Sequence, residues 1–390
     1  MTRPASDAPT GDAAVLAMAV TATTAAVLPA FLTGAVGVQL RDDLGFGEAG
    51  LGLAIAAFFA GGASGSILLG RLTHRLGPIG ALRVGGLVAA TTSVAIALQA
   101  GSLLSLAVLL GVGGLANAMS QPAANLLLAD RLPADRLGRA LGIKQSGMPL
   151  ATLLGGLAVP GLAKTIGWEA AYLAAAALAV LSVIWVSTDH NPTRAVLGKQ
   201  RPETTGAGLA VLALGMFFGA AAAGALSAFL VSSAVASGVD EAMAGLLLSM
   251  GAACGIAVRV AMGVRADRRP EAQLRTVSVM LALGAVAFAL FAIQRPGVAV
   301  AITPFAFGAG WAWPGLFNFA VVRANPRSAA AATGVTQTGV YLGALCGPIG
   351  FGLVVDAAGY STAWLATAAS ALAAAIVFAF GDRAVTLARR

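Results

Sequence analysis

Charged residues are scarce in this chain of 390 residues, where Asp, Glu, Lys and Arg together make up only 10%. Histidine and cysteine occur twice each, which is too few for a disulfide framework or a cluster of metal ligands. Both histidines, His74 and His190, fall in polar segments, and no carboxylate lies deep in an apolar run, so no catalytic triad can be assembled. We therefore expect no enzyme activity, no metal site and no cofactor.

Long apolar runs fill the rest of the chain, which is 58% hydrophobic with a mean hydropathy of +0.87. A bilayer core about 30 Å thick needs roughly 20 apolar residues per helical crossing. The sequence therefore predicts an all-α membrane protein with twelve transmembrane helices. The expected spans are 13–40, 49–70, 80–100, 102–128, 140–163, 169–187, 207–234, 242–264, 273–294, 296–322, 329–354 and 361–380.

The basic residues predict the orientation of these spans. Of the 24 Lys and Arg residues, nineteen fall in alternate polar segments on one side and three on the other. Because cytoplasmic loops carry the excess of Lys and Arg, both termini are expected in the cytoplasm. The positive charge is then explained by topology and by anionic lipid, without nucleic acid. The span 13–40 is too long for a signal-peptide core, so we expect it to be retained.

Two internal repeats divide the chain. The stretch beginning "EAGLGLAIAAFFAGG" at Glu48 aligns with "EAMAGLLLSMGAACG" at Glu241, an offset of 193 residues. At an offset of 192 residues, "GIKQSG" from Gly142 aligns with "GVTQTG" from Gly334. We expect an N-terminal six-helix bundle over 1–187, a polar cytoplasmic linker over 188–206 and a C-terminal six-helix bundle over 207–390.

The polar segment after the second span carries a family motif. "GRLTHRLG" from Gly70 resembles the Gly-x-x-x-Asp-Arg-x-Gly signature of the major facilitator superfamily, although His74 replaces the acid. "GVRADR", in the second repeat, keeps the acid. The resemblance implies two pseudo-symmetric six-helix bundles that rock around a site near the midplane of the membrane. It also implies a cytoplasmic gate, for which the expected residues are Gly70, His74, Arg75, Asp267 and Arg268.

Two cations lie inside the predicted spans, Lys144 in 140–163 and Arg259 in 242–264. Charges inside a bilayer are kept mainly where they face a cavity or a partner, and here no deep carboxylate could pair with them. Lys144, and less readily Arg259, could instead extend along its helix to the cytoplasmic surface, and this alternative stays open. A bound anion would compensate both charges.

The sequence around Arg259 strengthens the anion interpretation. "RVAMGVRADR" resembles the Arg-x-x-x-Gly-x-x-x-Asp-Arg pattern of the oxalate/formate and monocarboxylate branches of the superfamily, in which the Arg contacts the substrate carboxylate. We therefore expect a monomeric secondary transporter that moves a small organic anion by alternating access, as importer or exchanger. Protons are a candidate second substrate.

Further polar and aromatic residues mark candidate faces of a cavity. Asn117 and Gln121 share one helical face, and Trp311 and Asn318, seven residues apart, share another. Hydrogen bonding between helices is the alternative role for the amides, and packing or an interfacial belt is the alternative for the tryptophans. The expected substrate-binding residues are Arg259, Lys144, Gln145, Asn117, Gln121, Trp311, Trp313, Asn318, Gln337 and Tyr341.

A proton-coupled efflux antiporter for drugs or metabolites is the competing interpretation. "GALCGPIGFG" from Gly343 resembles the Gly-Pro-rich antiporter motif, but it falls in the eleventh span, whereas that motif belongs in the fifth. Ala107 stands where the antiporter family has an Arg. We therefore favour the anion transporter. The abundance of Arg, Ala and Gly is typical of a high-GC bacterium, whose inner membrane is the expected location.

Overall fold

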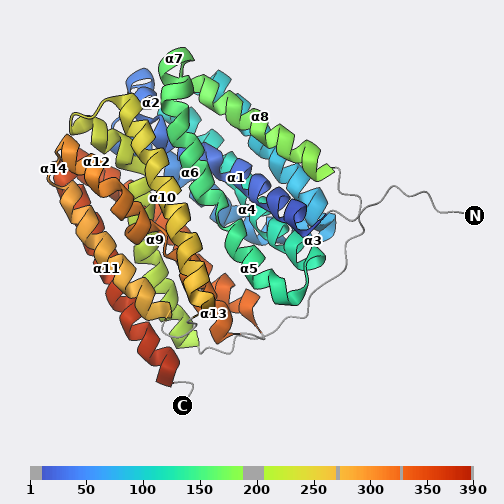
Figure 1. The fold of residues 1–390 in the computed structure, drawn as a ribbon. Coiled ribbons are helices and arrows are strands. Elements are labelled where there is room, and N and C mark those ends of the chain that lie inside the picture. The colour runs from blue at the N-terminus through green and yellow to red at the C-terminus, as the bar shows by residue number, and fades with distance from the viewer. Residues whose placement is uncertain (1–10, 188–205, 269–272, 326–327, 388–390) are drawn as a thin grey trace, which may run out of the picture.

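Helices make up nearly all of the computed structural model, which describes residues 11–187, 206–268, 273–325 and 328–387; no strand occurs in these ranges (Figure 1). The helices are α1 (Asp12–Ala35), α2 (Gly37–Leu44), α3 (Glu48–Gln99), α4 (Leu103–Arg131), α5 (Ala134–Lys144), α6 (Gly147–Ala158), η1 (Val159–Ala163), α7 (Lys164–Ile166), α8 (Trp168–Ser187), α9 (Gly206–Ala236), α10 (Glu241–Arg268), α11 (Gln273–Phe291), α12 (Pro296–Phe305), η2 (Ala306–Trp311), α13 (Pro314–Ala324) and α14 (Ala329–Leu387). The expected all-α membrane fold is confirmed.

Within the described residues, eleven segments are long and apolar enough to cross a membrane, against twelve expected from the sequence. The difference lies in α14, whose apolar segment Ala332–Gly381 has 50 residues. At 1.5 Å per residue it would be about 75 Å long, more than twice the thickness of a bilayer core. Gly359 interrupts it with a left-handed backbone (φ 79°), as Gly77 interrupts α3 (φ 71°). Each of these long helices therefore supplies two crossings.

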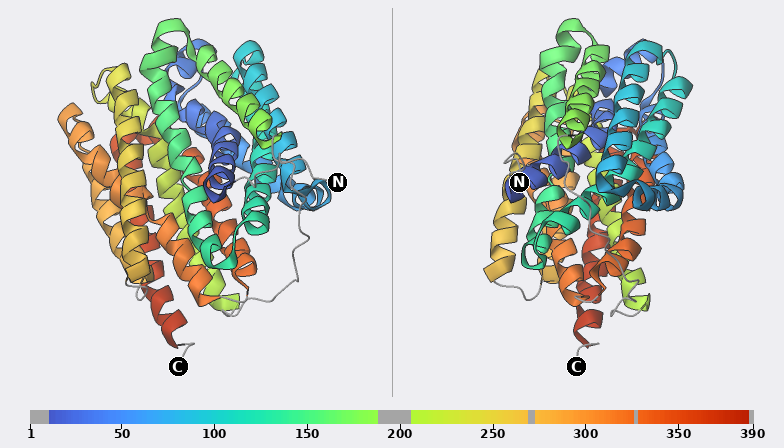
Figure 2. Two further views of the ribbon diagram at one scale, coloured as in Figure 1. Left: turned by 45° about the vertical axis from the view of Figure 1, so that its right-hand side comes forward. Right: turned by 90° about the vertical axis from the view of Figure 1, so that its right-hand side faces the viewer.

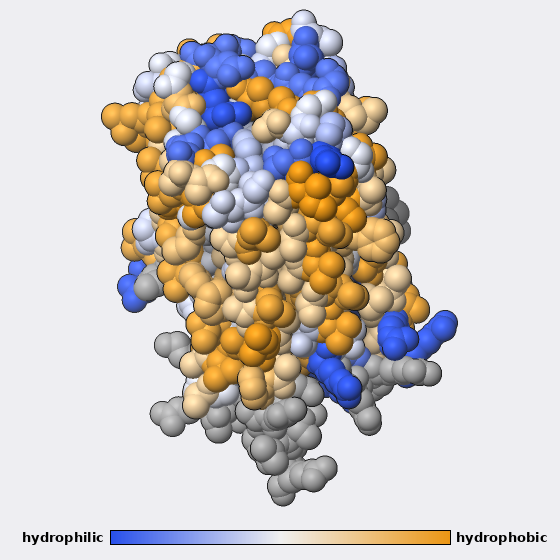
Figure 3. Space-filling view, turned by 90° about the vertical axis from the view of Figure 1, so that its left-hand side faces the viewer, coloured by the Kyte–Doolittle hydropathy of each residue, from blue (hydrophilic) through white to orange (hydrophobic). Residues whose placement is uncertain are grey.

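An apolar belt surrounds the bundle. On the face drawn in Figure 3, hydrophobic residues cover the middle, and hydrophilic residues gather towards both ends. Large apolar side chains such as Leu68 and Leu104 are 70% and 74% exposed. Such exposure is typical of a surface that faces lipid tails, so the belt agrees with a protein that crosses the membrane many times.

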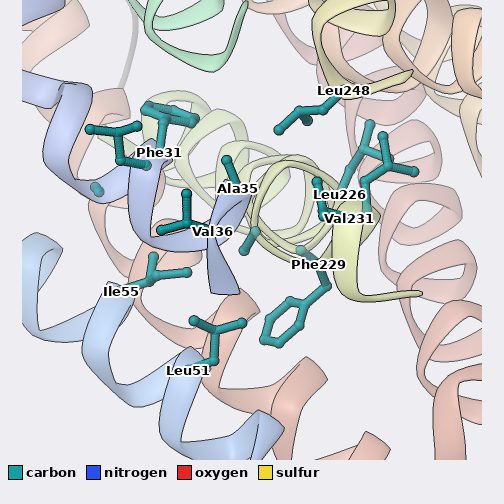
Figure 4. Packing of buried hydrophobic residues seen from close by; sticks show 14 of the residues in the cluster. Phe31, Ala35, Val36, Leu51, Ile55, Leu226, Phe229, Val231 and Leu248 are labelled. Carbon is teal, nitrogen blue, oxygen red and sulfur yellow. The ribbon is translucent and has the colours of Figure 1, made fainter. Parts of the chain in front are cut away.

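Helices from the two repeats pack directly against each other. We call the described helices before residue 188 the N-terminal helices and those after residue 205 the C-terminal helices. α1 packs on α9, α3 on α14, and α6 on α10. Figure 4 shows the packing of α1 on α9, in which Ala35 lies on the side of Leu226, and Phe31 and Phe229 belong to the same hydrophobic core.

Polar contacts reinforce this packing at one end of the bundle, which holds α2 and α7 and which we call the α2 end (Figures 1 and 2). The Asp356 carboxylate accepts hydrogen bonds from the backbone N–H groups of Glu48 and Ala49, at 3.1 and 3.0 Å. These amides begin α3, where the helix dipole favours an anion. Lys164 also forms an ion pair with Glu241 at 3.4 Å. Both contacts join an N-terminal to a C-terminal helix, so this end is closed.

Candidate functional site

A helix break lies beside the centre of the bundle, at Gln145 and Ser146. The expected span over 140–163 corresponds to the apolar segment Arg139–Ile166, but its helix is not continuous as predicted, since α5 ends at Lys144 and α6 begins at Gly147. Pro149 explains the break because proline has no N–H group to donate to the carbonyl four residues earlier. That carbonyl belongs to Gln145, and it is left open toward the centre.

A second break lies across from the first, between η2 and α13. The sequence predicts a single helix over 296–322, but Pro314 begins a new helix after the π-helical turn. The missing N–H of Pro314 frees the carbonyl of Gly310, and the indole N–H of Trp313 donates to that oxygen at 3.0 Å. Trp313 is therefore held as part of the break.

Arg259 of α10 reaches both breaks. Its Nη1 donates to the Gln145 carbonyl at 3.3 Å, and its Nη2 donates to the Trp311 carbonyl at 2.8 Å. The guanidinium carbon also lies 4.8 Å from the centre of the Trp311 ring, within the range of a cation–π contact. Its Nε is buried and has no hydrogen-bond partner among the described residues. The guanidinium thus keeps donor capacity for another acceptor.

The cavity beside Arg259 has a volume of about 120 Å³ and is bounded by helices of both repeats. Its polar lining residues are Gln145, Ser227, Arg259, Asn318 and Gln337. The remaining walls are apolar, aromatic or glycine and include Phe31, Phe59, Met148, Met216, Trp311, Trp313 and Pro348. A mostly apolar chamber with a few convergent polar groups is the usual form of a site for a small molecule.

Six of the ten expected substrate-binding residues line this cavity: Gln145, Arg259, Trp311, Trp313, Asn318 and Gln337. The other four, Lys144, Asn117, Gln121 and Tyr341, contribute no atom to its wall in this arrangement. Sequence reasoning missed Ser227, Met148 and the apolar walls. Small and apolar residues of this kind are equally common at lipid-facing and packing positions, so nothing in their pattern distinguished them.

Lys144 lies behind the cavity, and its residue is only 2% exposed. Its ammonium group donates to Oε1 of Gln121, whose Nε2 donates to Oδ1 of Asn117 at 3.2 Å. The alternative in which Lys144 extends to the surface is therefore wrong for this arrangement. No carboxylate among the described residues pairs with the ammonium group, so its positive charge has only an amide for compensation.

The expected cytoplasmic gate is described only in part. Gly70 lies within α3 with open space around it, and the side chains of Arg75 and Arg268 are exposed. The side chains of His74 and Asp267 lie outside the described residues. The role of His74 and Asp267 stays a prediction. At the α2 end, the contacts of Asp356 with the start of α3 join the two repeats, and the sequence did not predict them.

Comparisons with known proteins agree with this architecture. The sequence model described as "Major Facilitator Superfamily" matches residues 13–345. A relative from Mycobacterium tuberculosis, described as an MFS-type transporter, is 27% identical over 313 residues, which cover 76% of this chain and 68% of the relative. A shorter match, 30% identical over 152 residues, covers 39% of this chain and 29% of an Arabidopsis thaliana protein named "Probable anion transporter 3, chloroplastic".

The fold is also similar to solved structures. A bacterial homologue of the human lysosomal transporter Spinster, described as inward-facing and unoccupied, superposes with a TM-score of 0.72. That match covers 98% of each chain at 18% identity, a level at which it supports the shared fold alone. An occupied inward-facing structure of such a homologue gives a TM-score of 0.71 at 17% identity.

Proposed function

Because this chain belongs to the major facilitator superfamily of membrane transporters, which are not enzymes, we propose that it carries a small organic anion. The cargo would bear a carboxylate group and would cross the membrane by alternating access, by import or exchange. The observation that carries this proposal is Arg259, a cation in the central cavity that has no carboxylate partner among the described residues.

The chemistry of the guanidinium favours a carboxylate. Arg presents paired N–H groups in a planar fork that matches the two oxygens of a carboxylate, and such charge-assisted bonds are stronger than neutral ones. The backbone carbonyls that now bind Arg259 are neutral and leave Nε free. A cationic cargo would instead be repelled. The plant relative named as an anion transporter supports an anionic cargo in general terms.

The walls of the cavity favour an apolar body attached to the charged group. Phe31, Phe59 and Met148 border the space on the side of the N-terminal helices, and Trp311 covers one face of Arg259. Buried polar groups on a cargo would need partners that these walls do not offer. Asn318 and Gln337 could each satisfy one further polar atom.

Lys144 adds a second positive charge next to Gln145. We assign it, with Gln121 and Asn117, a supporting role in which its field attracts the anion without direct contact in this arrangement. Tyr341 lies on α14, which already lines the cavity through Gln337, and its side chain joins the site only if the rocking motion rotates this helix about its axis.

Transport measurements in proteoliposomes test the proposal. We expect saturable uptake of acetate, lactate or benzoate, with benzoate favoured by the apolar walls, and competition among these anions. A rhodamine-type cationic dye should not be moved. The same measurements with and without a pH gradient will show whether protons are coupled. Proton-driven export of the dye, together with no movement of any of the three carboxylates, would contradict the anion proposal and favour the efflux antiporter.

We further propose that the protein lies in a bacterial inner membrane, as a monomer, with both termini in the cytoplasm. The excess of basic residues in alternate loops supports this orientation. After removal of Cys254 and Cys346, a single cysteine at Ser187 or Gly206 should react with an impermeant thiol reagent only from the cytoplasmic side. Reaction from outside intact cells would reverse the orientation.

A further inference from the structure

The open carbonyl of Gln145 results from one proline. In an uninterrupted α-helix the N–H of residue 149 would donate to this oxygen, but residue 149 is Pro. The second repeat provides the comparison, since Gln337 and Tyr341 lie 192 residues after Gln145 and Pro149. Tyr341 has an N–H group, and α14 continues without a break through this region. Only the first repeat therefore presents an open carbonyl at this position.

Arg259 occupies that carbonyl from the opposite repeat. The 3.3 Å contact from Nη1 to the Gln145 oxygen joins a C-terminal helix to the break between two N-terminal helices, and both residues line the central cavity. We call this contact the Arg259 bridge. It differs from the polar contacts at the α2 end because it lies where the cargo is proposed to bind.

We propose that Pro149 is a positioning residue that keeps the Gln145 carbonyl open as the resting partner of Arg259, and that the anion displaces this carbonyl when it binds. The inference rests on the proposed function of Arg259 as the anion site. A carboxylate is the stronger acceptor because its bonds to guanidinium are charge-assisted and bidentate. In the empty carrier, the carbonyl supplies a hydrogen bond that a buried guanidinium would otherwise lack.

The exchange of acceptors links binding to movement. While the Gln145 carbonyl holds Arg259, it adds a direct contact between the two sets of helices in the arrangement seen here. A bound carboxylate removes that contact and so lowers the stability of this arrangement relative to the next one. A ligand shifts a conformational equilibrium only through such a difference in interaction between the two states.

Distance measurements between spin labels test the role of Pro149 without any cargo. The labels would replace Arg139 of α5 and Arg323 of α13, which are exposed and belong to different repeats, in a protein lacking Cys254 and Cys346. Pro149→Ala restores the N–H group, which then competes for the Gln145 carbonyl. We expect the population of the present conformation to fall roughly tenfold relative to the other conformations of the carrier. A factor of this size corresponds to the loss of one hydrogen bond to a charged group.

A double-mutant cycle separates the bridge from general effects on packing. Arg259→Gln should shift the distances between the labels by a similar amount. The double variant with Pro149→Ala and Arg259→Gln should show no larger shift than Arg259→Gln alone, because both changes remove the same contact. Gln145→Ala keeps the backbone carbonyl and should leave the distances as in the wild type. Pro149→Gly also restores the N–H group and replaces Pro149→Ala if that variant fails to fold. Unchanged distances in the proline variants, or additive shifts in the cycle, would overturn the proposal.

Binding of benzoate distinguishes this inference from the proposed function. Without a resident acceptor to displace, the Pro149→Ala variant should bind benzoate several-fold more tightly than the wild type, as measured by calorimetry. If benzoate and the other carboxylates fail to bind the wild type, the proposed function fails, while the distances still decide whether Pro149 maintains the bridge. If the wild type binds benzoate and the Pro149→Ala variant binds it no more tightly, displacement of the carbonyl is wrong.

Discussion

Replacement of Arg259 by Lys is expected to raise the KM for a carboxylate substrate by tenfold or more. The positive charge remains, but the planar fork that can bind two oxygens at once is lost. A hydrogen bond to a charged group contributes about 1.5–3 kcal/mol, and about 1.4 kcal/mol corresponds to a factor of ten. Initial uptake rates in proteoliposomes, measured over a range of substrate concentrations, give the KM directly.

Arg265 provides the matched control, because it lies on the same helix as Arg259 but is exposed. Arg265→Lys should leave the KM as in the wild type. Lys144→Gln should raise it by a smaller factor than Arg259→Lys, since Lys144 lies behind the cavity wall. A KM that is the same for Arg259→Lys and the wild type, in protein that inserts and folds normally, would remove Arg259 from the site.

The two buried cations could be predicted from the sequence, and their surroundings could not. A charge within an apolar run is conspicuous because its insertion into a bilayer is costly, so Lys144 and Arg259 stand out without any structure. Whether such a charge faces a cavity depends on the rotation of its helix and on neighbours far along the chain. The structure places Arg259 in the cavity wall and Lys144 behind it, although both are cations within apolar runs of the sequence.

The number of crossings was predictable, but the breaks in the helices were not. The length of an apolar segment identifies a span whether or not its helix is interrupted. The bilayer core sets the length that must be apolar, and this length does not reveal where the helix breaks. Prolines within membrane helices are common, and many leave the helix continuous, as Pro122 does in α4 and Pro348 does in α14. Pro149 and Pro314 accompany real breaks, and only the structure shows what binds the freed carbonyls, which is Arg259 of a distant helix in one case and the nearby Trp313 in the other.

Replacement of Gly52 has the second large expected effect, because a glycine there lets α3 pack directly against the backbone of α14. Gly52 of α3 is buried against α14, and a Cβ atom placed on it would lie 2.2 Å from the Pro348 carbonyl oxygen. That atom belongs to the backbone, so no side-chain rotation can make room. Gly52→Ala is expected to reduce transport by about tenfold or more, since the packed helices must separate to accept the methyl group.

Gly350 offers the matched control on the partner helix, since a Cβ atom there would meet nothing within 4 Å. Gly350→Ala should transport at the wild-type rate, and both variants should insert and purify equally. If Gly52→Ala reduces transport because the α2 end no longer closes, that end should be more accessible in this variant. A single cysteine replacing Glu48 should then react with a thiol reagent faster in the Gly52→Ala variant than in the Gly350→Ala variant. Equal transport by the two alanine variants would contradict this expectation. The transport cycle would then not require α3 and α14 to pack as closely as they do here, and the closed α2 end would not be part of that cycle.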